Sequence, residues 1–261
     1  MSTPTITIVG ANGRIGNMLG TMATQQKHAH QRVTRTDDPA DLANPGPSGP
    51  IVLCIRNDAM DAILAQIHPS RHPDLVFVQN GVIQPWLTTH GLGGCTLGVL
   101  YVAVPTVAAP PIAGADSVIS GKWADVISKL LNTGGVRTRS VSRDELHQEI
   151  AIKLAWICVF GLICTATQQK VGGAIDLHQE DIRALCAEIH PVLVRTLGLR
   201  LSPDALTERV VHYGTSIRHF PAGLKEWRWR NGWLTDAAAS IDVDLPIHDA
   251  WLQRTRAVSA P

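Results

Sequence analysis

A glycine-rich loop near the start of the chain has the residue types needed to bind a phosphate group. The residues GANGRIG directly follow the β-branched run TITIV and precede a stretch with helical spacing of apolar residues. Glycines at such a junction allow a tight turn and a close approach to a pyrophosphate, whose charge is met by amides at the helix N-terminus. The spacing GxxGxxG is one residue away from the GxGxxG pattern, and this strand-to-helix context favours dinucleotide binding over an ordinary turn. We expect the nucleotide to contact Gly10, Asn12, Gly13, Arg14, Ile15 and Gly16.

Charged and hydroxyl side chains follow the second predicted strand, where the type of dinucleotide is selected. Residues 33–38 read VTRTDD, an arginine before two aspartates. An acidic side chain at this place binds a ribose 2′-hydroxyl, whereas an arginine accommodates a 2′-phosphate. Arg35 comes first and is flanked by Thr34 and Thr36, which favours NADP(H) over NAD(H). A solvated loop in which arginine and aspartate neutralise each other is the alternative.

One lysine interrupts a long apolar helix pattern. Residues 150–166, IAIKLAWICVFGLICTA, have no charged residue besides Lys153. A buried ammonium needs a carboxylate, a carbonyl or a ligand, because unpaired burial costs several kcal/mol or lowers its pKa. Lys153 is therefore a candidate site residue; the alternative is a lysine that reaches solvent from the first turns of the helix. The stretch is at the lower limit of length for a membrane span, so a buried core helix is favoured.

Composition and spacing argue against several other chemistries. The formal charge of +1 gives the protein no strong positive field for binding nucleic acid. The alternating tryptophans and arginines of EWRWRNG at residues 226–232 therefore indicate cation–π packing rather than stacking on nucleic-acid bases. The 11 histidines show neither metal-ligand spacing nor a Ser/His/Asp order. The five cysteines lack CxxC spacing and lie mostly in apolar runs, which predicts free thiols. The N-terminus resembles no signal peptide, so we expect a cytoplasmic protein with a small-molecule partner.

The elements that position these residues follow a βαβ pattern in the first half of the chain. Apolar runs at 5–9, 51–55, 75–78 and 96–104 predict strands, with the second strand at 32–35 and helices at 15–26 and 59–67. The second and third strands are too close for a further strand and its crossover helix, so we expect a sheet of fewer than six strands.

Helical spacing dominates from about residue 123, which predicts an all-helical second half. Ser142, followed by Glu145, and Ser202, followed by Pro203, are expected at helix starts. We therefore predict the α/β class: a shortened Rossmann-type parallel sheet domain at residues 1–140, followed by an all-helical substrate and dimerisation domain at 141–261. The substrate cleft is expected between them.

Together these features resemble the ketopantoate reductase family and its relatives with a 6-phosphogluconate-dehydrogenase-like helical domain. The glycine loop, Arg35, and Arg56 in LCIRND follow the order of the family. QNG is similar to the family's asparagine–glycine, which implies that Asn80 lies between nicotinamide and substrate. Lys153 matches the position of the family's catalytic lysine. The spacing in EWRWRNG matches that between the family's glutamate and its asparagine–glycine, which implies that Glu226 binds the substrate.

The chain departs from the family in the predicted substrate pocket. The family usually has asparagines four and eight residues after the lysine, where this sequence has Ile157 and Gly161. Two amide side chains that contribute roughly 1–3 kcal/mol each are therefore missing. Ser216 is the candidate for the family's carboxylate-binding serine, although its spacing to Glu226 is shorter. We expect a bulkier or less polar substrate than ketopantoate.

The sequence thus predicts an NADPH-dependent reductase that transfers hydride to a carbonyl (2-oxo acid-like) or imine carbon, with Lys153 and Glu226 as catalytic residues. An imine- or opine-type reductase, or a biosynthetic tailoring reductase, would differ only in the pocket. A non-catalytic sensor of NADP(H) is the alternative from another class. No metal, nucleic acid or membrane is expected as a partner, and the apolar helical half offers a surface for a homodimer.

Overall fold

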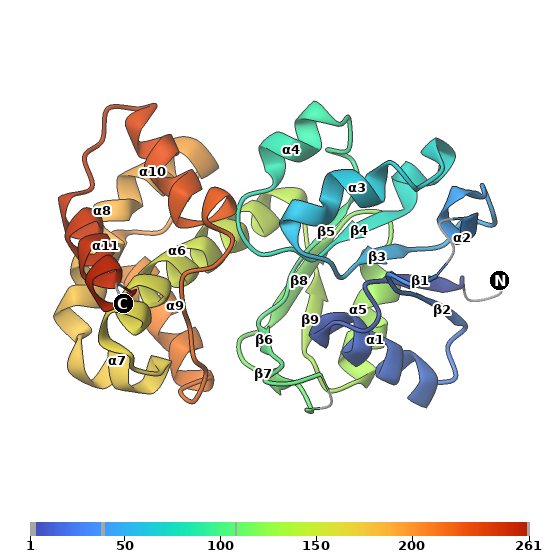
Figure 1. Ribbon diagram of the computed structural model, residues 1–261, viewed down its shortest axis with the longest axis horizontal. Helices are drawn as coiled ribbons and strands as arrows, with labels where there is room; N and C mark the ends of the chain where they lie inside the picture. Colours follow the sequence, from blue (N-terminus) through green and yellow to red (C-terminus); the bar gives the residue numbers. More distant parts are fainter. Residues whose placement is uncertain (1–3, 38–39, 108, 260–261) are drawn as a thin grey trace. The chain divides into compact units, whose positions relative to one another are not determined.

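In the computed structural model, which describes residues 4–37, 40–107 and 109–259, the chain divides into two units (Figure 1). Unit 1 consists of Met1–Gln79 and Ile83–Leu146, and unit 2 of Asn80–Val82 and His147–Pro261. The predicted division between residues 140 and 141 falls close to the start of the long second segment of unit 2. The functions assigned to the two predicted domains remain predictions.

A seven-stranded sheet forms the centre of unit 1 (Figure 1). In spatial order its strands are β2 (His30–Val33), β1 (Ile6–Val9), β3 (Ile51–Leu53), β4 (Leu75–Phe77), β5 (Thr96–Val99), β8 (Ser117–Ser120) and β9 (Thr138–Ser140). The strands from β2 to β5 pair in parallel, β8 is antiparallel to β5, and β9 is parallel to β8. The central strands are apolar and buried on both faces, as parallel sheets require.

A mostly parallel sheet followed by helices confirms the predicted fold class, but the expected number of strands is wrong. Only the short α2 (Ala40–Ala43) lies between β2 and β3, so no strand is added beyond β2. The sheet grows at its other edge, where β8 and β9 are too short and too rich in serine and threonine to show a strand period. The predicted strand at 96–104 also ends early, because the chain leaves the sheet after Val99 and forms β6 (Val102–Ala103), which pairs with β7 (Ile112–Ala113).

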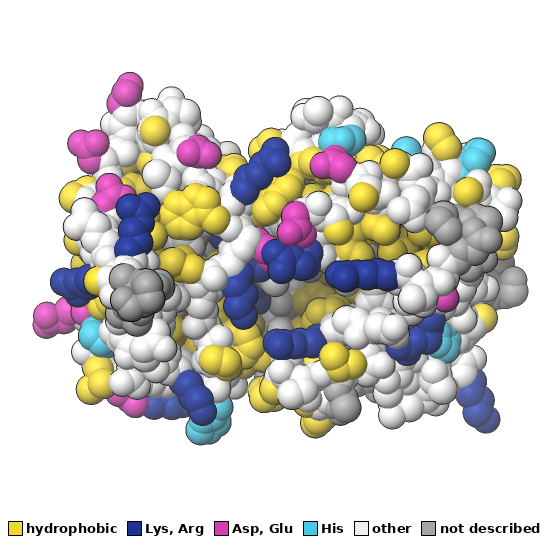
Figure 2. All heavy atoms as spheres, viewed as in Figure 1, with side chains coloured by type: hydrophobic (Ala, Val, Ile, Leu, Met, Phe, Trp, Pro, Cys, Tyr) yellow, Lys and Arg dark blue, Asp and Glu magenta, His cyan; other side chains and the backbone are white. Residues whose placement is uncertain are grey.

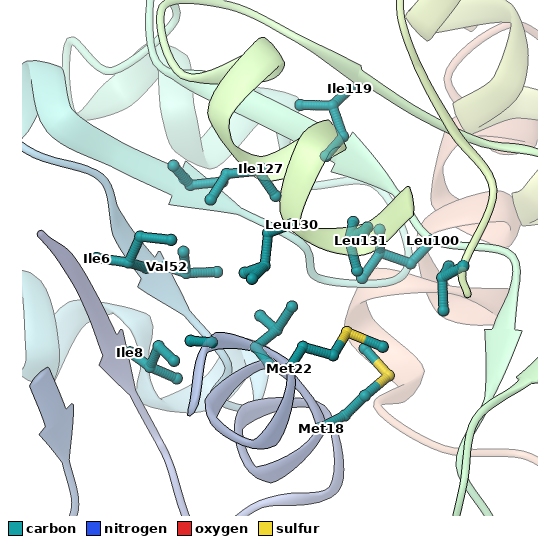
Figure 3. Packing of buried hydrophobic residues seen from close by; sticks show 14 of the residues in the cluster. Ile6, Ile8, Met18, Met22, Val52, Leu100, Ile119, Ile127, Leu130 and Leu131 are labelled. Atoms are coloured by element: carbon teal, nitrogen blue, oxygen red, sulfur yellow. The ribbon is translucent and has the colours of Figure 1, made fainter. Parts of the chain in front are cut away.

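Two helices, α1 (Arg14–Gln25) and α5 (Ala124–Thr133), pack together on one face of this sheet. Figure 3 shows Met18 and Met22 of α1 beside Leu130 and Leu131 of α5, and the sheet contributes buried aliphatic side chains to the same cluster. The Nε2 atom of Gln26 also donates to the carbonyl oxygen of Leu130 at 2.9 Å. Burial of this apolar surface is the main stabilising contribution in unit 1.

The opposite face of the sheet carries smaller helices. Phe77 of β4 alternates with Val76 of the first cluster, so it points to this second face, where its ring centroid lies 5.9 Å from that of Trp86. The helical elements between β3 and β5 are η1 (Asn57–Ala59), α3 (Met60–Leu64), η2 (Pro69–Asp74) and α4 (Gln84–Thr89). The indole of Trp86 in α4 donates to Asp61 of α3 at 2.8 Å, which joins these two helices.

A buried carboxylate ties together three segments of unit 1. Asp74 accepts hydrogen bonds from Arg71 at 2.8 Å, from Lys122 at 2.7 Å and from the indole of Trp123 at 3.2 Å. The hydroxyl of Ser48 donates to the same carboxylate at 3.1 Å. Because so many donors converge on one acceptor, the cluster anchors the start of β4 to the segments before β3 and α5.

Unit 2 is helical and is built around α6 (Arg143–Thr167), which begins in unit 1. Residues 151–164 are buried on all sides, which explains why this helix shows no single apolar stripe. The predicted cap is confirmed, because the hydroxyl of Ser142 accepts from the amide of Glu145 at 3.1 Å. The remaining elements are α7 (Val171–Leu177), α8 (Gln179–Leu197), α9 (Pro203–Ser216), η3 (Trp227–Trp229), α10 (Asn231–Ala239) and α11 (Pro246–Ser259).

Helix α6 is long and apolar enough to cross a membrane, but 78% of its most apolar window is buried inside the protein. This burial is typical of a core helix. The five cysteines are free thiols, as predicted. Figure 2 shows acidic and basic side chains among apolar ones on the face drawn there, in keeping with the formal charge of +1.

Candidate functional site

The glycine-rich loop lies where the strand order of unit 1 changes direction. It follows β1, which has β2 on one side and β3 on the other. The amides of Gly10 and Ala11 donate to the carbonyl oxygen of Val33 at the end of β2, at 2.9 and 3.1 Å. The amide of Cys54, after β3, donates to the carbonyl oxygen of Val9 at 2.8 Å. In open α/β sheets this position, at the carboxyl ends of the strands, is the usual ligand site.

Two of the loop glycines cannot be replaced without displacing the backbone. Gly10 has a φ of +80°, and a Cβ atom there would lie 2.5 Å from the carbonyl oxygen of Cys54. A Cβ atom on Gly16 would lie 2.3 Å from the carbonyl oxygen of Gly10. Gly13 is the N-cap of α1 and offers no side-chain acceptor to the first-turn amides. These amides are therefore oriented to bind an anion, and the cradle fits a pyrophosphate.

Arg32, which the sequence did not single out, borders the same loop. Its Nη2 atom donates to the carbonyl oxygen of Ala11 at 2.8 Å and lies 3.2 Å from Oδ1 of Asn17. Its Nη1 atom would lie 2.3 Å from a Cβ atom on Gly20. The guanidinium therefore lies against the first turns of α1, in space that Gly20 leaves open. The sequence contained one signal for this contact, which was Gly20 within a predicted helix. Arg32 lies opposite this glycine because β2 runs two residues earlier than the predicted strand.

The two other predicted nucleotide contacts of unit 1 lie after neighbouring strands. Arg35 is exposed in the turn after β2, where the carboxylate of Asp37 accepts from the amide of Thr34 at 2.6 Å. Asp37 is itself exposed, and this hydrogen bond leaves its carboxylate able to accept others. Asp38 lies outside the described residues. After β3, Arg56 forms an exposed ion pair with Asp58 at 3.2 Å.

Residues Asn80–Val82 and the tryptophan–arginine segment, widely separated in sequence, meet in unit 2. The amide of Val82 donates to the carbonyl oxygen of Trp229 at 2.9 Å. Gly81 has a φ of +89°, and a Cβ atom there would lie 2.3 Å from the same oxygen. Asn80 is exposed beside this contact. The structure thus joins two of the segments that the family resemblance connects with the substrate.

Lys153 is buried in unit 2, with 7% of its surface exposed. Its Nζ atom donates to the hydroxyl of Tyr213 at 3.1 Å and lies 4.3 Å from the centroid of that ring. The ring of Trp156, one turn along α6, is 5.7 Å away. Burial, together with the positive charge of Arg230, lowers the pKa of Lys153 to about 7. An amine that gains and loses a proton near neutral pH is suited to general acid–base chemistry.

Glu226 and Arg230 form an ion pair in the segment before α10. Nη2 of Arg230 donates to Oε2 of Glu226, and both side chains are largely buried. Glu226 has a φ of +46°, in the left-handed region. The guanidinium of Arg228 lies 5.3 Å from the ring centroid of Trp229, which confirms the predicted cation–π packing in this segment. Arg230 has a different function from that expected, because it pairs with the predicted catalytic glutamate.

The positions that depart from the family are also placed. Ile157 and Gly161 are buried on α6. A Cβ atom on Gly161 would lie 3.8 Å from Oδ1 of Asn231, so the amide of an α10 residue lies beside the glycine. Nδ2 of Asn231 donates to the carbonyl oxygen of Cys158 at 3.2 Å. Ser216 is exposed at the end of α9, and its hydroxyl donates to the carbonyl oxygen of Tyr213 at 2.6 Å.

Sequence reasoning missed three residues of this part of unit 2: Tyr213, Arg230 and Asn231. Arg230 and Asn231 belong to a segment that the sequence marked as unusual, but their partners, Glu226 and the carbonyl oxygen of Cys158 on α6 respectively, could not be read from spacing. Tyr213 lies in an ordinary amphipathic helix and gave no signal. Among the residues that the structure describes, no three His, Cys, Asp or Glu side chains come together in a way that could hold a metal ion.

No protein-family model matches this chain, and no curated protein matches it in sequence. Solved structures are similar over almost its whole length. A D-mandelate dehydrogenase in a ternary structure with NADH and anilino(oxo)acetate has 10% sequence identity and a TM-score of 0.75, with 97% of each chain covered. A PanE/ApbA family ketopantoate reductase from Ralstonia eutropha has 14% identity and a TM-score of 0.74, with 98% of each chain covered. A dimeric ketopantoate reductase from Staphylococcus aureus has 16% identity and a TM-score of 0.73, with 97% of this chain and 98% of that chain covered. The chain therefore has the fold shared by ketopantoate reductases and D-mandelate dehydrogenase.

Proposed function

We propose that this protein is an NAD(P)H-dependent reductase of carbonyl compounds. The observation that carries the proposal is the buried Lys153, whose pKa of about 7 suits it to move a proton at neutral pH. The fold supports the same activity, because the similar structures include ketopantoate reductases and a D-mandelate dehydrogenase with NADH. The glycine cradle after β1 supports a dinucleotide as the cofactor.

The cofactor, when bound, supplies the hydride, and the protein supplies binding and orientation. In this proposal the amides at the start of α1 bind the pyrophosphate, and Arg35 binds a 2′-phosphate, so that NADP(H) is preferred. Asn80 positions the nicotinamide and the substrate. The further proposed contacts to the nucleotide are Gly10, Asn12, Gly13, Arg14, Ile15, Gly16 and Arg56.

Lys153 acts as the proton donor in this proposal. Its Nζ atom donates a proton to the oxygen of the substrate carbonyl, or to the nitrogen of an imine, as negative charge develops there. Because burial and Arg230 disfavour the ammonium form, the lysine releases this proton more readily than an exposed lysine. The pair of Glu226 and Arg230 anchors the polar part of the substrate.

The substrate class follows from the residues around the lysine. Ile157 is apolar where the family has an amide, whereas the amide of Asn231 lies beside Gly161. Ser216 is the proposed contact to a substrate carboxylate, once its hydroxyl turns away from the carbonyl oxygen of Tyr213. We therefore propose a 2-oxo acid-like or imine substrate less polar than ketopantoate. An imine- or opine-type reductase, or a biosynthetic tailoring reductase, remains the alternative among enzymes. A cytoplasmic location and a homodimer complete the proposal, the latter supported by the dimeric ketopantoate reductase of similar fold.

The proposal is tested by following NADPH absorbance with a panel of 2-oxo acids and cyclic imines whose side chains range from methyl to aryl. Turnover of any member supports a reductase, and the best member defines the substrate class. Tight NADPH binding without turnover of any member would instead favour the sensor. Cofactor selection is tested with Arg35→Gln, which should weaken NADPH binding about 10- to 100-fold and leave NADH binding unchanged. Arg137→Gln, at an exposed arginine before β9, is the matched control.

A further inference from the structure

Tyr213 contacts Lys153 and has no role in the proposed function. It lies in the last turn of α9 and is 3% exposed. Its ring centroid is 4.9 Å from that of Trp156, at an interplanar angle of 59°. Packing against this large ring restricts the position of the phenol, and therefore of its hydroxyl oxygen. The hydroxyl lies 3.1 Å from Nζ of Lys153.

A phenol can serve a lysine in both of its protonation states. A hydroxyl is both a donor and an acceptor, whereas an ammonium only donates. The tyrosine oxygen therefore accepts from the ammonium form, and after proton loss the hydroxyl can turn its own proton toward the amine. Burial raises the pKa of Tyr213, so the phenol stays neutral while Lys153 titrates. A carboxylate in the same place would bind only the ammonium and would hold the proton too tightly for transfer.

The charges around this pair act on the lysine in opposite directions. Burial and the guanidinium of Arg230, from the segment before α10, favour the neutral amine. Glu226 is ion-paired with Arg230. On α6 itself, burial raises the pKa of Cys158, so its thiol contributes no negative charge. From α9 the Tyr213 oxygen favours the ammonium, because a hydrogen bond to a charged group stabilises its charged form.

We propose that Tyr213 is a positioning residue for Lys153: its hydroxyl holds Nζ in one place and exchanges the donor and acceptor roles as the proton leaves and returns. The contact itself is independent of the proposed reductase activity. Its effect on turnover rests on that activity.

The chain offers a direct test, because it contains only two tyrosines, Tyr101 and Tyr213. Protein labelled with 3-fluorotyrosine should therefore give two ¹⁹F resonances. The Tyr213 resonance should titrate with a midpoint near pH 7, following the lysine, and this titration should vanish in Lys153→Met. Tyr101 lies in unit 1 and is the internal control, with no titration in the same range. A Tyr213 resonance that stays constant between pH 5.5 and 8.5 would overturn the proposal.

Tyr213→Phe then measures what the hydroxyl contributes, because the ring and its packing against Trp156 are retained. Loss of an acceptor for the ammonium should lower the lysine pKa by about one pH unit. The basic limb of the pH–rate profile should move by the same amount, and kcat should fall about tenfold with the KM for NADPH unchanged. His212→Gln, at an exposed neighbour on α9, should leave the profile in place. An unchanged profile in Tyr213→Phe would overturn the positioning function.

The proposed reductase activity and the proposed function of Tyr213 can be refuted separately. A titrating Tyr213 resonance in a protein that turns over no carbonyl or imine would refute the reductase and keep the coupling of the two side chains. Turnover with a constant Tyr213 resonance would keep the reductase and refute the function of Tyr213.

Discussion

Replacing the buried lysine of unit 2 with methionine should stabilise the protein. The pKa of Lys153 falls from 10.5 to about 7 on burial, and each pH unit corresponds to about 1.4 kcal/mol. The ammonium form therefore costs on the order of 5 kcal/mol in the folded state. Methionine has a similar length and no charge, but it loses the hydrogen bond to Tyr213, which contributes about 1 kcal/mol. The expected net gain for Lys153→Met at pH 6 is about 4 kcal/mol in the free energy of unfolding.

The pH dependence of this gain has a defined sign. Below pH 7 the lysine is protonated in both the folded and the unfolded state, so the cost of the buried charge is complete. Between about pH 7 and 10.5 only the unfolded state holds the proton, and the free energy of unfolding of the wild-type protein rises with pH. Lys153→Met lacks this rise. The difference between the two proteins should therefore shrink to about 1 kcal/mol or less at pH 9.5.

Urea unfolding followed by tryptophan fluorescence at pH 6 and pH 9.5 measures both quantities. Lys170→Met, at an exposed lysine of unit 2, is the control and should change the free energy of unfolding by less than about 0.5 kcal/mol at either pH. A variant Lys153→Met that is less stable than the wild-type protein at pH 6 would refute the reasoning. That result would mean that the contacts of the ammonium outweigh the cost of its burial.

Three further substitutions test other parts of the structure. Gly10→Ala should abolish NADPH binding in a fluorescence titration, because the added Cβ atom meets a carbonyl oxygen and φ is positive, whereas Gly94→Ala, which meets nothing within 4 Å, should leave binding unchanged. Gly20→Ala should displace only the end of the Arg32 side chain, so NADPH binding should weaken less than tenfold, and a loss as large as that of Gly10→Ala would contradict this placement. Asp74→Asn should lower the free energy of unfolding by about 3 kcal/mol at pH 7, because it leaves two cations without a buried charge partner. Burial opposes ionisation of the Asp74 carboxyl, but its basic partners hold its pKa below the ordinary value. The stability that this carboxylate contributes should therefore be lost only as the pH falls below about 4. An unchanged midpoint of urea unfolding in Asp74→Asn would argue against the buried cluster.

Local patterns were sufficient to predict the elements that form a continuous apolar or β-branched run. The run before the glycine loop and the apolar stretch of α6 are both of this kind, and the sheet class and the core helix follow from them. The strands β8 and β9 could not be predicted, because three or four residues rich in serine and threonine show no period. Their pairing depends on the edge that β5 offers, which is a tertiary feature.

The candidate site divides in the same way. Lys153 stood out because a charge in an apolar helix is costly, and the structure places it in buried surroundings. Tyr213 and Arg230 could not be predicted as its neighbours, because their contacts depend on how α9 and the segment before α10 pack against α6. Asn231 could not be predicted beside Gly161 for the same reason. The sequence shows that Gly161 has no side chain, but it does not show which residue of another helix lies next to it.

In the proposed function, Lys153 supplies the proton in an NAD(P)H-dependent reduction. Its most direct test is the turnover of Lys153→Ala with the best substrate of the panel, measured together with the dissociation constant for NADPH. We predict that kcat falls by about 10²- to 10⁴-fold while the dissociation constant changes less than about twofold. Turnover equal to that of the wild-type protein would contradict the claim.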